Sequence, residues 1–322
     1  MFVTTKKYSN IIIYQIACLS AIFILISCSF LDKNPSNEIS KTYNLTINRD
    51  FWGVPYIKGK TDQDVAFGIG FVHAEDAYED LVELMPLYRG ENALFNGLKS
   101  IETDYLVRLL KIHSKVENIG KKQLSKNILS MAQAYADGVN MYANQNPNKV
   151  NQKLHPVTQE DIIAGSYIQH LFFAGLDRDL SQIASQEKQS IPTGSNAIAI
   201  NSIKADSNAS YLLINSHQPL SGPVGWYELN IESNSGWHGH GGNFPGSFLI
   251  NVGFNNTMSW GATVNRPDVM DIFELTINPE NPDQYLLDGV WESFKIEEDF
   301  LFFKIFGFLK IRTKQKFRYS KF

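Results

Sequence analysis

The chain has 322 residues, of which 43% are hydrophobic and 12% aromatic, so it has enough apolar material to bury a large core. This composition excludes an intrinsically disordered protein. The formal net charge of −4 argues against a general nucleic-acid-binding protein, which needs a basic surface to neutralise phosphates.

The first 27 residues have the pattern of an export signal. Two lysines precede an apolar run over 11–26, which is followed at once by Ser27-Cys28, giving the sequence Leu25-Ile26-Ser27-Cys28. This ending resembles the bacterial lipobox, whose cysteine carries lipid and becomes the first residue of the mature protein. We therefore expect a lipoprotein signal peptide over 1–27, lipid on Cys28 and a protein exported to the periplasm or outer membrane of a bacterium. An uncleaved transmembrane anchor is the alternative, because the run approaches the ~17-residue lower limit for a span.

A polar tether over 28–42 is expected between this anchor and the folded body. Alternating residues over 45–50 then predict a strand. Residues 53–57 predict a turn and a second short strand, in which Pro55 indicates an edge position because proline cannot donate a ladder hydrogen bond.

Three helices are predicted before residue 172. The first spans 61–86, with a threonine cap at its start and Pro86 as its stop. Gly68 and Gly70 inside it predict that another element packs closely there, since each glycine costs a helix about 1 kcal/mol. The other two are predicted over 124–142 and 158–171.

From Ser195 onward the pattern changes to strands separated by turn residues. The predicted strands cover 197–200, 211–215, 227–231, 248–252, 258–264 and 272–277. Helices first and antiparallel strands after indicate an α+β fold. Residues 310–322 also alternate as a strand, and the chain looks as if it stops partway through a sheet. Their basic side chains are interpreted as a solvated strand face, with binding to an acidic surface as the alternative.

The segment Thr193-Gly194-Ser195-Asn196 allows two interpretations. It is typical of a turn that enters a strand, because glycine and asparagine adopt left-handed backbone easily. It also suits a chain that cuts itself before Ser195 and leaves that serine at a new N-terminus, where the freed α-amine accepts the hydroxyl proton. These four residues alone favour the turn.

Several motifs in one order resemble the penicillin acylase family. They are Arg49-Asp50-Phe51-Trp52-Gly53-Val54-Pro55-Tyr56-Ile57, Gly70-Phe71-Val72-His73-Ala74-Glu75-Asp76, Gly194-Ser195-Asn196, Phe244-Pro245-Gly246, Asn251-Val252-Gly253-Phe254, Ser259-Trp260-Gly261-Ala262-Thr263-Val264 and Tyr285-Leu286-Leu287-Asp288-Gly289. Their common order over 45–289 is far more specific than any single motif. The serine segment is most similar to acyl-homoserine-lactone and other long-chain amide acylases within the family.

The resemblance implies an N-terminal-nucleophile hydrolase with an αββα sandwich of antiparallel sheets, incomplete at the C-terminus. It implies cleavage between Gly194 and Ser195, giving a mainly helical α-type chain over 43–194 and the first part of a β-type chain over 195–322. The two processed chains would form a heterodimer. Ser195 would be the nucleophile, assisted by its own α-amine, which titrates near neutral pH.

Further site residues follow from the same resemblance. His217 would lie beside the nucleophile and position the amine, although a lone histidine beside a proline is more often structural. The backbone N–H of Val264 would stabilise the oxyanion, a contribution of about 2.7–4 kcal/mol for such a donor. Asp268 and Asp271 match positions that bind a structural calcium in some relatives, and two solvated acidic residues are the alternative. No cofactor is expected for catalysis.

The run Trp237-His238-Gly239-His240-Gly241-Gly242 is interpreted as a glycine-rich loop that lines the acyl pocket. His238 and His240 would point the same way on a strand, but no further ligand for zinc is visible in the sequence.

Three features depart from the family pattern. Tyr56 stands where the family usually has histidine, and Ala77 where it usually has arginine. Family members also continue beyond residue 322 and take a second oxyanion donor, an asparagine, from that part. The expected function is that of an acylase precursor acting on small N-acyl substrates such as acyl-homoserine lactones or penicillin-like amides, with no nucleic-acid partner. The alternative is an inactive fragment or an acyl-binding surface lipoprotein.

Overall fold

The computed structural model describes residues 42–176, 194–205, 208–221, 224–263, 271 and 273–321. The chain divides into the units 1–42 and 43–322, and only the second is described beyond Thr42. The export signal, Cys28 and almost all of the predicted tether therefore lie outside the described residues.

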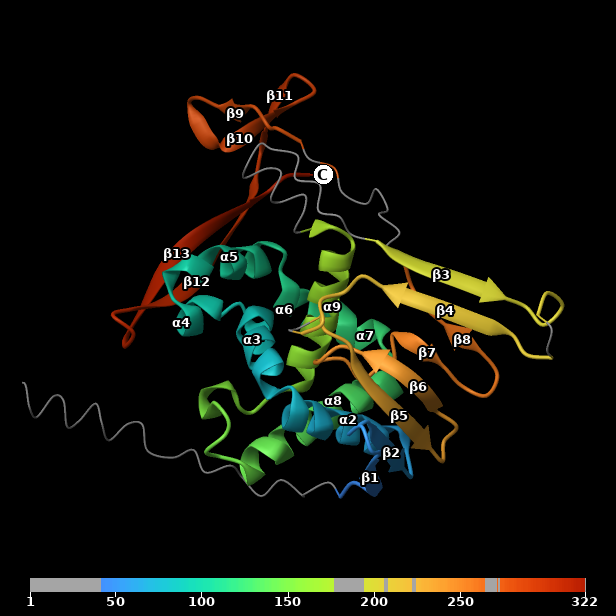
Figure 1. Cartoon of the computed structure of the whole chain (residues 1–322). Coiled ribbons are helices and arrows are strands. Elements are labelled where there is room, and N and C mark those ends of the chain that lie inside the picture. Colours follow the sequence, from blue (N-terminus) through green and yellow to red (C-terminus); the bar gives the residue numbers. More distant parts are fainter. Residues whose placement is uncertain are drawn as a thin grey trace, which may run out of the picture. The chain divides into compact units, whose positions relative to one another are not determined.

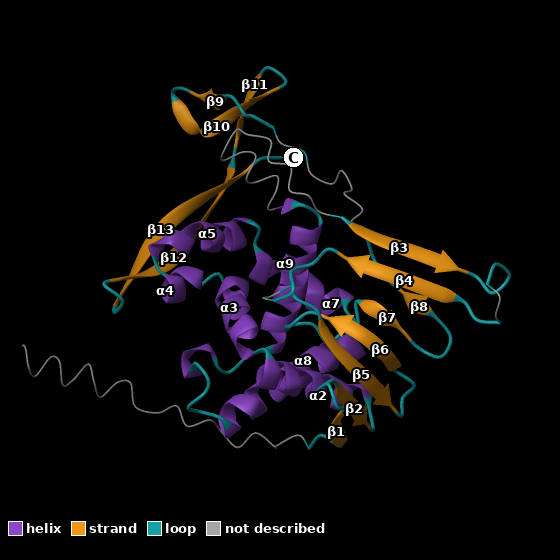
Figure 2. Ribbon diagram, in the orientation of Figure 1, coloured by secondary structure: helices purple, strands orange, loops and turns teal. Residues whose placement is uncertain are grey.

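In the part of the chain that the structure describes, the helices lie between residues 62 and 173, and strands precede and follow them (Figures 1 and 2). The helical elements are α2 (Asp62–Asp76), α3 (Tyr78–Arg89), α4 (Asn92–Asn96), η2 (Leu98–Ser100), α5 (Ile101–Leu109), α6 (Ile112–Lys115), η3 (Val116–Gly120), α7 (Lys121–Gln123), α8 (Lys126–Gln145), η4 (Gln152–Leu154) and α9 (Gln159–Phe173). The strands are β1 (Leu45–Arg49), β2 (Pro55–Gly59), β3 (Ser195–Ile200), β4 (Tyr211–Ser216), β5 (Tyr227–Ser233), β6 (His238–Asn243), β7 (Val252–Phe254), β8 (Ser259–Trp260), β9 (Ile277–Asn278), β10 (Asn281–Leu287), β11 (Val290–Ser293), β12 (Lys295–Ile305) and β13 (Leu309–Tyr319).

The largest sheet has six strands in the order β1-β2-β5-β6-β7-β8. Its pairs are antiparallel except β2 and β5, which run parallel with Ile57 opposite Ile231. The predicted edge position of Pro55 is wrong, because β2 lies between β1 and β5. Pro55 is tolerated there because it is the first residue of its strand.

One face of this sheet is covered by helix α2, and helix α8 packs against α2 (Figure 1). The alternation along β5 shows why: Leu229 and Ile231 are buried, whereas Glu228 is exposed and Asn230 is only partly buried on the opposite face. The described residues combine helices with mainly antiparallel sheets, which confirms the α+β class.

Helices α2 and α8 approach each other backbone to backbone. A Cβ at Gly70 would lie 2.1 Å from the Tyr135 carbonyl oxygen, and a Cβ at Gly138 would lie 2.1 Å from that of Phe67. A Cβ at Gly68 would lie 2.5 Å from the Ile57 side chain of β2. The close packing predicted from Gly68 and Gly70 is therefore confirmed.

The first predicted helix is in fact two helices. Its backbone breaks at Ala77, whose N–H donates to the His73 carbonyl before α3 begins. Pro86 does not stop α3, which continues to Arg89 and ends where Gly90 adopts a left-handed conformation with φ of 62°. The predictions for α8 and α9 are confirmed, and Ser125 caps the first turn of α8.

The glycine-rich run at 237–242 is a strand, β6, and the loop predicted there is wrong. A Cβ at Gly241 would lie 2.0 Å from the Val252 carbonyl oxygen, so glycine permits β6 to approach β7 closely. Strand predictions fail at 248–251, which is irregular, and at 261–263 and 273–276, where β8 and β9 cover only two residues each.

Three small sheets complete the described part: β3–β4, β9–β11 and the long hairpin β12–β13. The strand predicted near the C-terminal end of the sequence is confirmed as β13. Among the residues that the structure describes, none of the helices is long and apolar enough to cross a membrane.

Candidate active site

Ser195 is the first residue of β3, and its hydroxyl faces the peptide that precedes it. Its Oγ donates a hydrogen bond to the Gly194 carbonyl oxygen at 2.7 Å. In the β3–β4 ladder Ser195 lies opposite Ser216. The ladder therefore holds the serine at the end of the hairpin, with its side chain next to the bond that self-cleavage would break.

A cavity of about 380 Å³ adjoins Ser195. Segments far apart in the sequence line it: His170 and Phe173 of α9 with Ala174 just after it, Ser195 and Ser216 of the β3–β4 hairpin with Gln218 just after it, and Trp226, Phe244, Asn251, Val252, Ala262 and Thr263 near the six-stranded sheet. Its walls are mainly apolar around a few polar groups, a composition typical of a small-molecule site.

Three aromatic rings form one wall of this cavity. Phe244 lies between Phe173 and Trp226, with ring centroids 5.7 Å and 4.3 Å away and nearly parallel planes. Such offset stacks stabilise ring positions by about 0.5–1.5 kcal/mol per pair beyond the area they bury. The wall is suited to contact with an aliphatic or aromatic acyl group.

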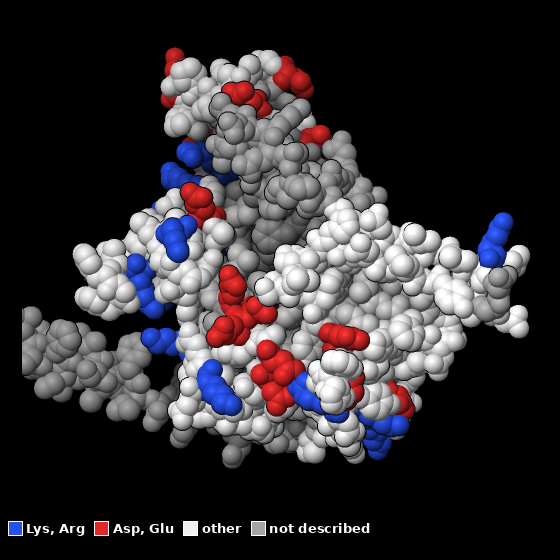
Figure 3. All heavy atoms as spheres, in the orientation of Figure 1, with Lys and Arg blue, Asp and Glu red and all other residues white. Residues whose placement is uncertain are grey.

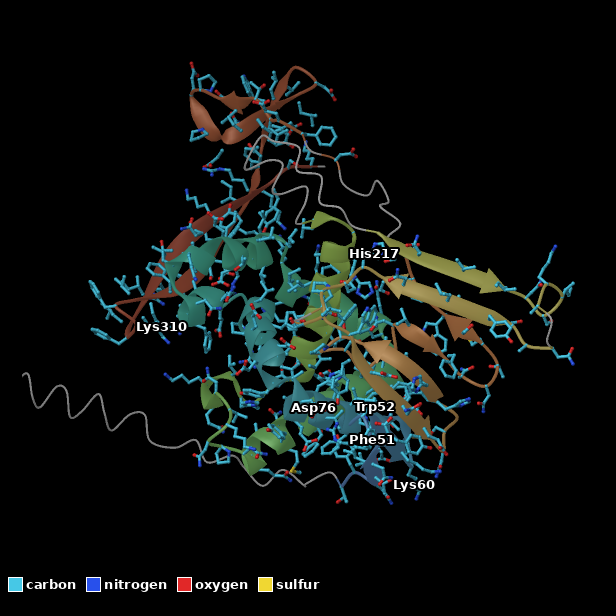
Figure 4. The ribbon with its side chains drawn as sticks, viewed as in Figure 1. Phe51, Trp52, Lys60, Asp76, His217 and Lys310 are labelled. Atoms are coloured by element: carbon cyan, nitrogen blue, oxygen red, sulfur yellow. The ribbon has the colours of Figure 1, made fainter. Side chains whose placement is uncertain are left out.

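His217 follows β4 directly, and its ring lies beside Gly194. A Cβ at Gly194 would be 3.5 Å from His217 Nδ1, so the missing side chain leaves room for the ring. Figure 4 shows His217 where the start of β3 meets the end of β4. The structure thus places His217 beside Gly194, while its expected role of positioning the amine of Ser195 stays a prediction.

The loop that carries Phe244 is fixed by a buried hydrogen-bond chain. Gly246 N–H donates to the Tyr135 hydroxyl at 2.9 Å, and that hydroxyl lies 2.8 Å from His73 Nδ1. His73 Nε2 lies 3.1 Å from Asn243 Oδ1, while Asn243 Nδ2 donates to the Ser247 carbonyl at 2.8 Å. These partners assign the proton to Nε2 and make Nδ1 the acceptor. Burial lowers the pKa of His73 to about 3, so its ring is neutral.

The two motifs nearest the N-terminus, which contain Arg49 and Asp76, contact each other next to this chain of hydrogen bonds. Arg49 pairs with Glu75 at 2.5 Å and with Asp76 at 2.8 Å, and the Tyr227 hydroxyl donates to Asp76 at 2.5 Å. These carboxylates help to hold the Arg49 pKa above its usual range. The Tyr227 ring in turn packs edge-on against His73, with centroids 4.6 Å apart. The arginine and aspartate of the motifs therefore join β1 to the end of α2.

Some predicted site residues are not brought to this cavity. Val264 and Asp268 lie outside the described residues, and Asp271 is exposed, so the oxyanion and calcium assignments stay predictions. His240 lies 3.1 Å from Glu228 and also contacts Asn230 on the open face of the sheet. No group of three or more His, Cys, Asp or Glu residues in the described ranges is arranged to hold a metal.

Sequence reasoning missed Asn251 as a site residue, although it quoted the motif that contains it. Asn251 lines the cavity, and its Oδ1 is buried without a hydrogen-bond partner among the described residues. An unsatisfied buried acceptor costs about 1–3 kcal/mol. The sequence contains no local signal for this, because burial of Asn251 depends on the surrounding strands.

Comparison with known proteins finds one matching family and relatives that are named as acylases. The family model described as penicillin amidase matches residues 44–304. The acyl-homoserine lactone acylase PvdQ of Pseudomonas fluorescens (strain Pf0-1) is 23% identical over 307 residues, covering 84% of this chain and 39% of that protein. The acyl-homoserine lactone acylase QuiP of Pseudomonas aeruginosa is 24% identical, covering 81% of this chain and 38% of that protein. The chain thus spans about two fifths of the length of these relatives.

Among solved structures, a thermostable penicillin G acylase from Alcaligenes faecalis matches 46% of this chain and 86% of its own chain. The identity is 18% and the TM-score is 0.37, which is too low to support an argument about the fold.

Proposed function

Because the chain belongs to the penicillin amidase family, we propose that it is the precursor of an acylase that cuts itself before Ser195 and then uses Ser195 on N-acyl substrates. Acyl-homoserine lactones are the favoured substrates, since PvdQ and QuiP are named for acting on them. Penicillin-like amides are the second class, from the description of the family.

The proposed self-cleavage is an N-to-O acyl shift. Ser195 Oγ attacks the Gly194 carbonyl carbon, the peptide nitrogen leaves as the α-amine of Ser195, and water then hydrolyses the resulting ester. Gly194 becomes a C-terminal carboxylate. In the second reaction the free amine accepts the Ser195 hydroxyl proton and Oγ attacks the amide carbon of the substrate. The C–N bond breaks, the substrate amine leaves with that proton, and water then hydrolyses the acyl ester on Ser195 to release the acid.

One observation supports this assignment above the others: Ser195 lies at a mainly apolar cavity and its Oγ is already hydrogen-bonded to the carbonyl that it would attack. The stacked rings of Phe173, Phe244 and Trp226 would contact the acyl group.

The remaining features of the proposal concern the assembled enzyme. The αββα sandwich is supported by the helices on one face of the six-stranded sheet and by the β3–β4 hairpin on the other. We further propose a heterodimer of the two processed chains, an exported protein with lipid on Cys28, a structural calcium at Asp268 and Asp271, and oxyanion stabilisation by Val264.

N-terminal sequencing tests the self-cleavage. After expression, the fragment that begins at the new terminus should read Ser-Asn-Ala-Ile-Ala, and Ser195→Ala should remain one chain. Ser202→Ala removes a hydroxyl from the exposed residue just beyond β3 and serves as the matched control. Cleavage of the Ser195→Ala chain at the same bond would exclude Ser195 as the attacking group.

Substrate assays separate the enzyme from an acyl-binding lipoprotein. The processed protein should release the amine from a long-chain N-acyl-homoserine lactone. Saturable binding of that lactone without release of amine, in a chain that has been cut before Ser195, would support the binding protein instead.

A further inference from the structure

The β12–β13 hairpin has one strongly basic face. Along β13, Lys310, Arg312, Lys314, Lys316 and Arg318 are all exposed and alternate with partly or fully buried residues. Residues two apart in a strand lie on the same face, so these five cations form one row. Lys314 pairs with Glu298 at 2.5 Å and Arg318 with Asp283 at 2.9 Å, while the other three form no ion pair with any described residue.

The opposite face of the hairpin attaches it to the helical part. Glu297 pairs with Lys111 of the α5–α6 turn at 2.6 Å, and Asp299 pairs with Arg108 at 3.3 Å. The Phe317 ring, 1% exposed, packs 5.0 Å from that of Tyr105. Two of the hairpin's acidic side chains thus pair inward and the cations of β13 face outward, so the row is held rigidly on the surface. Figure 3 shows Lys and Arg side chains along this hairpin.

The turn of the hairpin exposes aromatic side chains. Phe306 and Phe308 are 84% and 79% exposed, although both are large and apolar. Phe306 has φ of 53°, a left-handed conformation that a bulky residue adopts only at a cost. Figure 4 shows Lys310 close to this turn. Neither folding of the hairpin nor packing of a core accounts for two solvated phenylalanines beside a row of cations.

We propose that this hairpin docks on the surface of an anionic phospholipid bilayer, with Phe306 and Phe308 entering the interface and the cation row lying over the lipid phosphates. Aromatic rings beside basic side chains are the combination that the membrane interface favours. The cations also extend over rings of the same face, since Lys310 lies 4.8 Å from the Phe302 centroid and Arg312 4.8 Å from that of Phe300.

A bilayer fits better than a nucleic acid as the partner. The formal net charge of −4 weakens long-range attraction to either anionic partner, so the exposed phenylalanines, rather than charge, distinguish the two. The exposed phenylalanines project from a three-residue turn between Ile305 and Leu309, and such a narrow apolar tip can enter an interface without a shaped pocket.

The experiment uses the full chain and a reporter placed in the turn. Phe308→Trp should shift its fluorescence to shorter wavelength and be quenched by brominated lipid when vesicles of phosphatidylglycerol and phosphatidylcholine are added. Phosphatidylcholine vesicles alone should have no effect. The fluorescence of the unsubstituted chain is subtracted to remove the contribution of its five native tryptophans. A local reporter is needed because a leader or a lipid on Cys28 would attach the chain to vesicles without involving the hairpin.

Charge variants in the reporter background test the cation row. Lys310→Gln, Arg312→Gln and Lys316→Gln together should weaken the partition of the turn into anionic vesicles by roughly 100-fold, from ~1 kcal/mol for each basic residue near an anionic surface. The matched control replaces the exposed lysines Lys122, Lys126 and Lys153 by glutamine and should change the partition less than about twofold.

A turn variant separates binding from folding. Phe306→Asn places a residue suited to the left-handed conformation, so the thermal midpoint should hold or rise while partition falls by about tenfold. Three results would overturn the proposal: no quenching of the reporter by anionic vesicles, equal quenching with phosphatidylcholine alone, or the same loss from the control lysines as from the cation row. Binding of duplex DNA to the row without any reporter response to vesicles would likewise assign another partner.

Discussion

Gly70 of α2 and Gly138 of α8 bring two helices into backbone contact, whereas Ile198 and Leu213 of the β3–β4 hairpin leave 56% and 57% of their surface exposed. Both regions carry motifs that led to the family. In the helix pair, Gly70 lies against the backbone of Tyr135 and Gly138 against that of Phe67, and most of the residues around them are buried. The hairpin, which carries Ser195, is covered on one face, where Ile214 lies against Gly261.

The buried α2–α8 helix pair is the structural framework, whereas the β3–β4 hairpin carries the candidate catalytic serine. The buried helix pair holds His73 and Tyr135, which in turn fix the Phe244 loop through Asn243 and Gly246. The hairpin presents Ser195 to the cavity that this loop lines. The position of the cavity wall is therefore determined by core packing, and the position of Ser195 by a two-stranded ladder with one covered face.

The largest effect is expected from adding one methyl group to the helix pair. In Gly138→Ala the new Cβ would lie 2.1 Å from the Phe67 carbonyl oxygen and 2.8 Å from the Phe71 nitrogen, and backbone atoms cannot move aside. We expect a loss of about 3 kcal/mol or more in the free energy of unfolding, measured with urea. Gly120→Ala is the control, because its Cβ would meet the Ile163 side chain at an ordinary 3.6 Å and the backbone there is helical. Equal stability of both variants would contradict the close contact.

Low pH should lower the stability of the folded protein through protonation of His73 in the α2–α8 helix pair. Its pKa is about 3 in the folded protein and about 6.5 in the unfolded chain, so the unfolded state binds the proton first as the pH falls. Stability is then lost progressively below pH 6.5, by about 2 kcal/mol between pH 7 and pH 5 from this group. The measurement compares unfolding at both pH values in the original protein and in His73→Gln. The pH dependence of the variant should be smaller by that amount, and an unchanged dependence would show that His73 titrates normally.

Neighbouring residues of β4 should respond differently to the same substitution. Ile214 lies on the covered face and packs against Gly261, so Ile214→Thr should lower the free energy of unfolding by about 1–2 kcal/mol. Leu213 lies on the exposed face, and Leu213→Thr should stay within about 0.5 kcal/mol. A larger effect at Leu213 would show that another surface covers the outer face of the hairpin.

The smallest effect is expected at the cavity wall, where α9 meets the hairpin. Phe173→Leu removes one ring of the stack while keeping an apolar side chain, at a position that is already partly solvated. If the proposed acylase activity holds, the rate with a phenylacetyl amide should fall about threefold relative to a dodecanoyl amide. The ratio of kcat/KM values for the two substrates measures this. An unchanged ratio would place the acyl group away from Phe173.

Local chemistry determined much of what the sequence predicted. Thr61 caps α2, as predicted, because its hydroxyl accepts the Asp64 N–H three residues ahead, which requires no distant partner. Gly68 and Gly70 predicted close packing because glycine in a helix is unfavourable unless another element needs the space. The same order of motifs identified the family and placed Ser195 at the start of a strand.

Tertiary structure alone decided the features that depend on partners distant in the sequence. The glycine-rich residues 238–243 form a strand because Gly241 lets β7 approach, and strand stability comes from the neighbouring strand more than from the segment itself. Pro55 lies inside the sheet because β5 pairs with β2 across more than 170 residues. The rings of Phe173, Trp226 and Phe244 come from three separate segments, so no periodicity in the chain could have predicted that they form one wall beside Ser195.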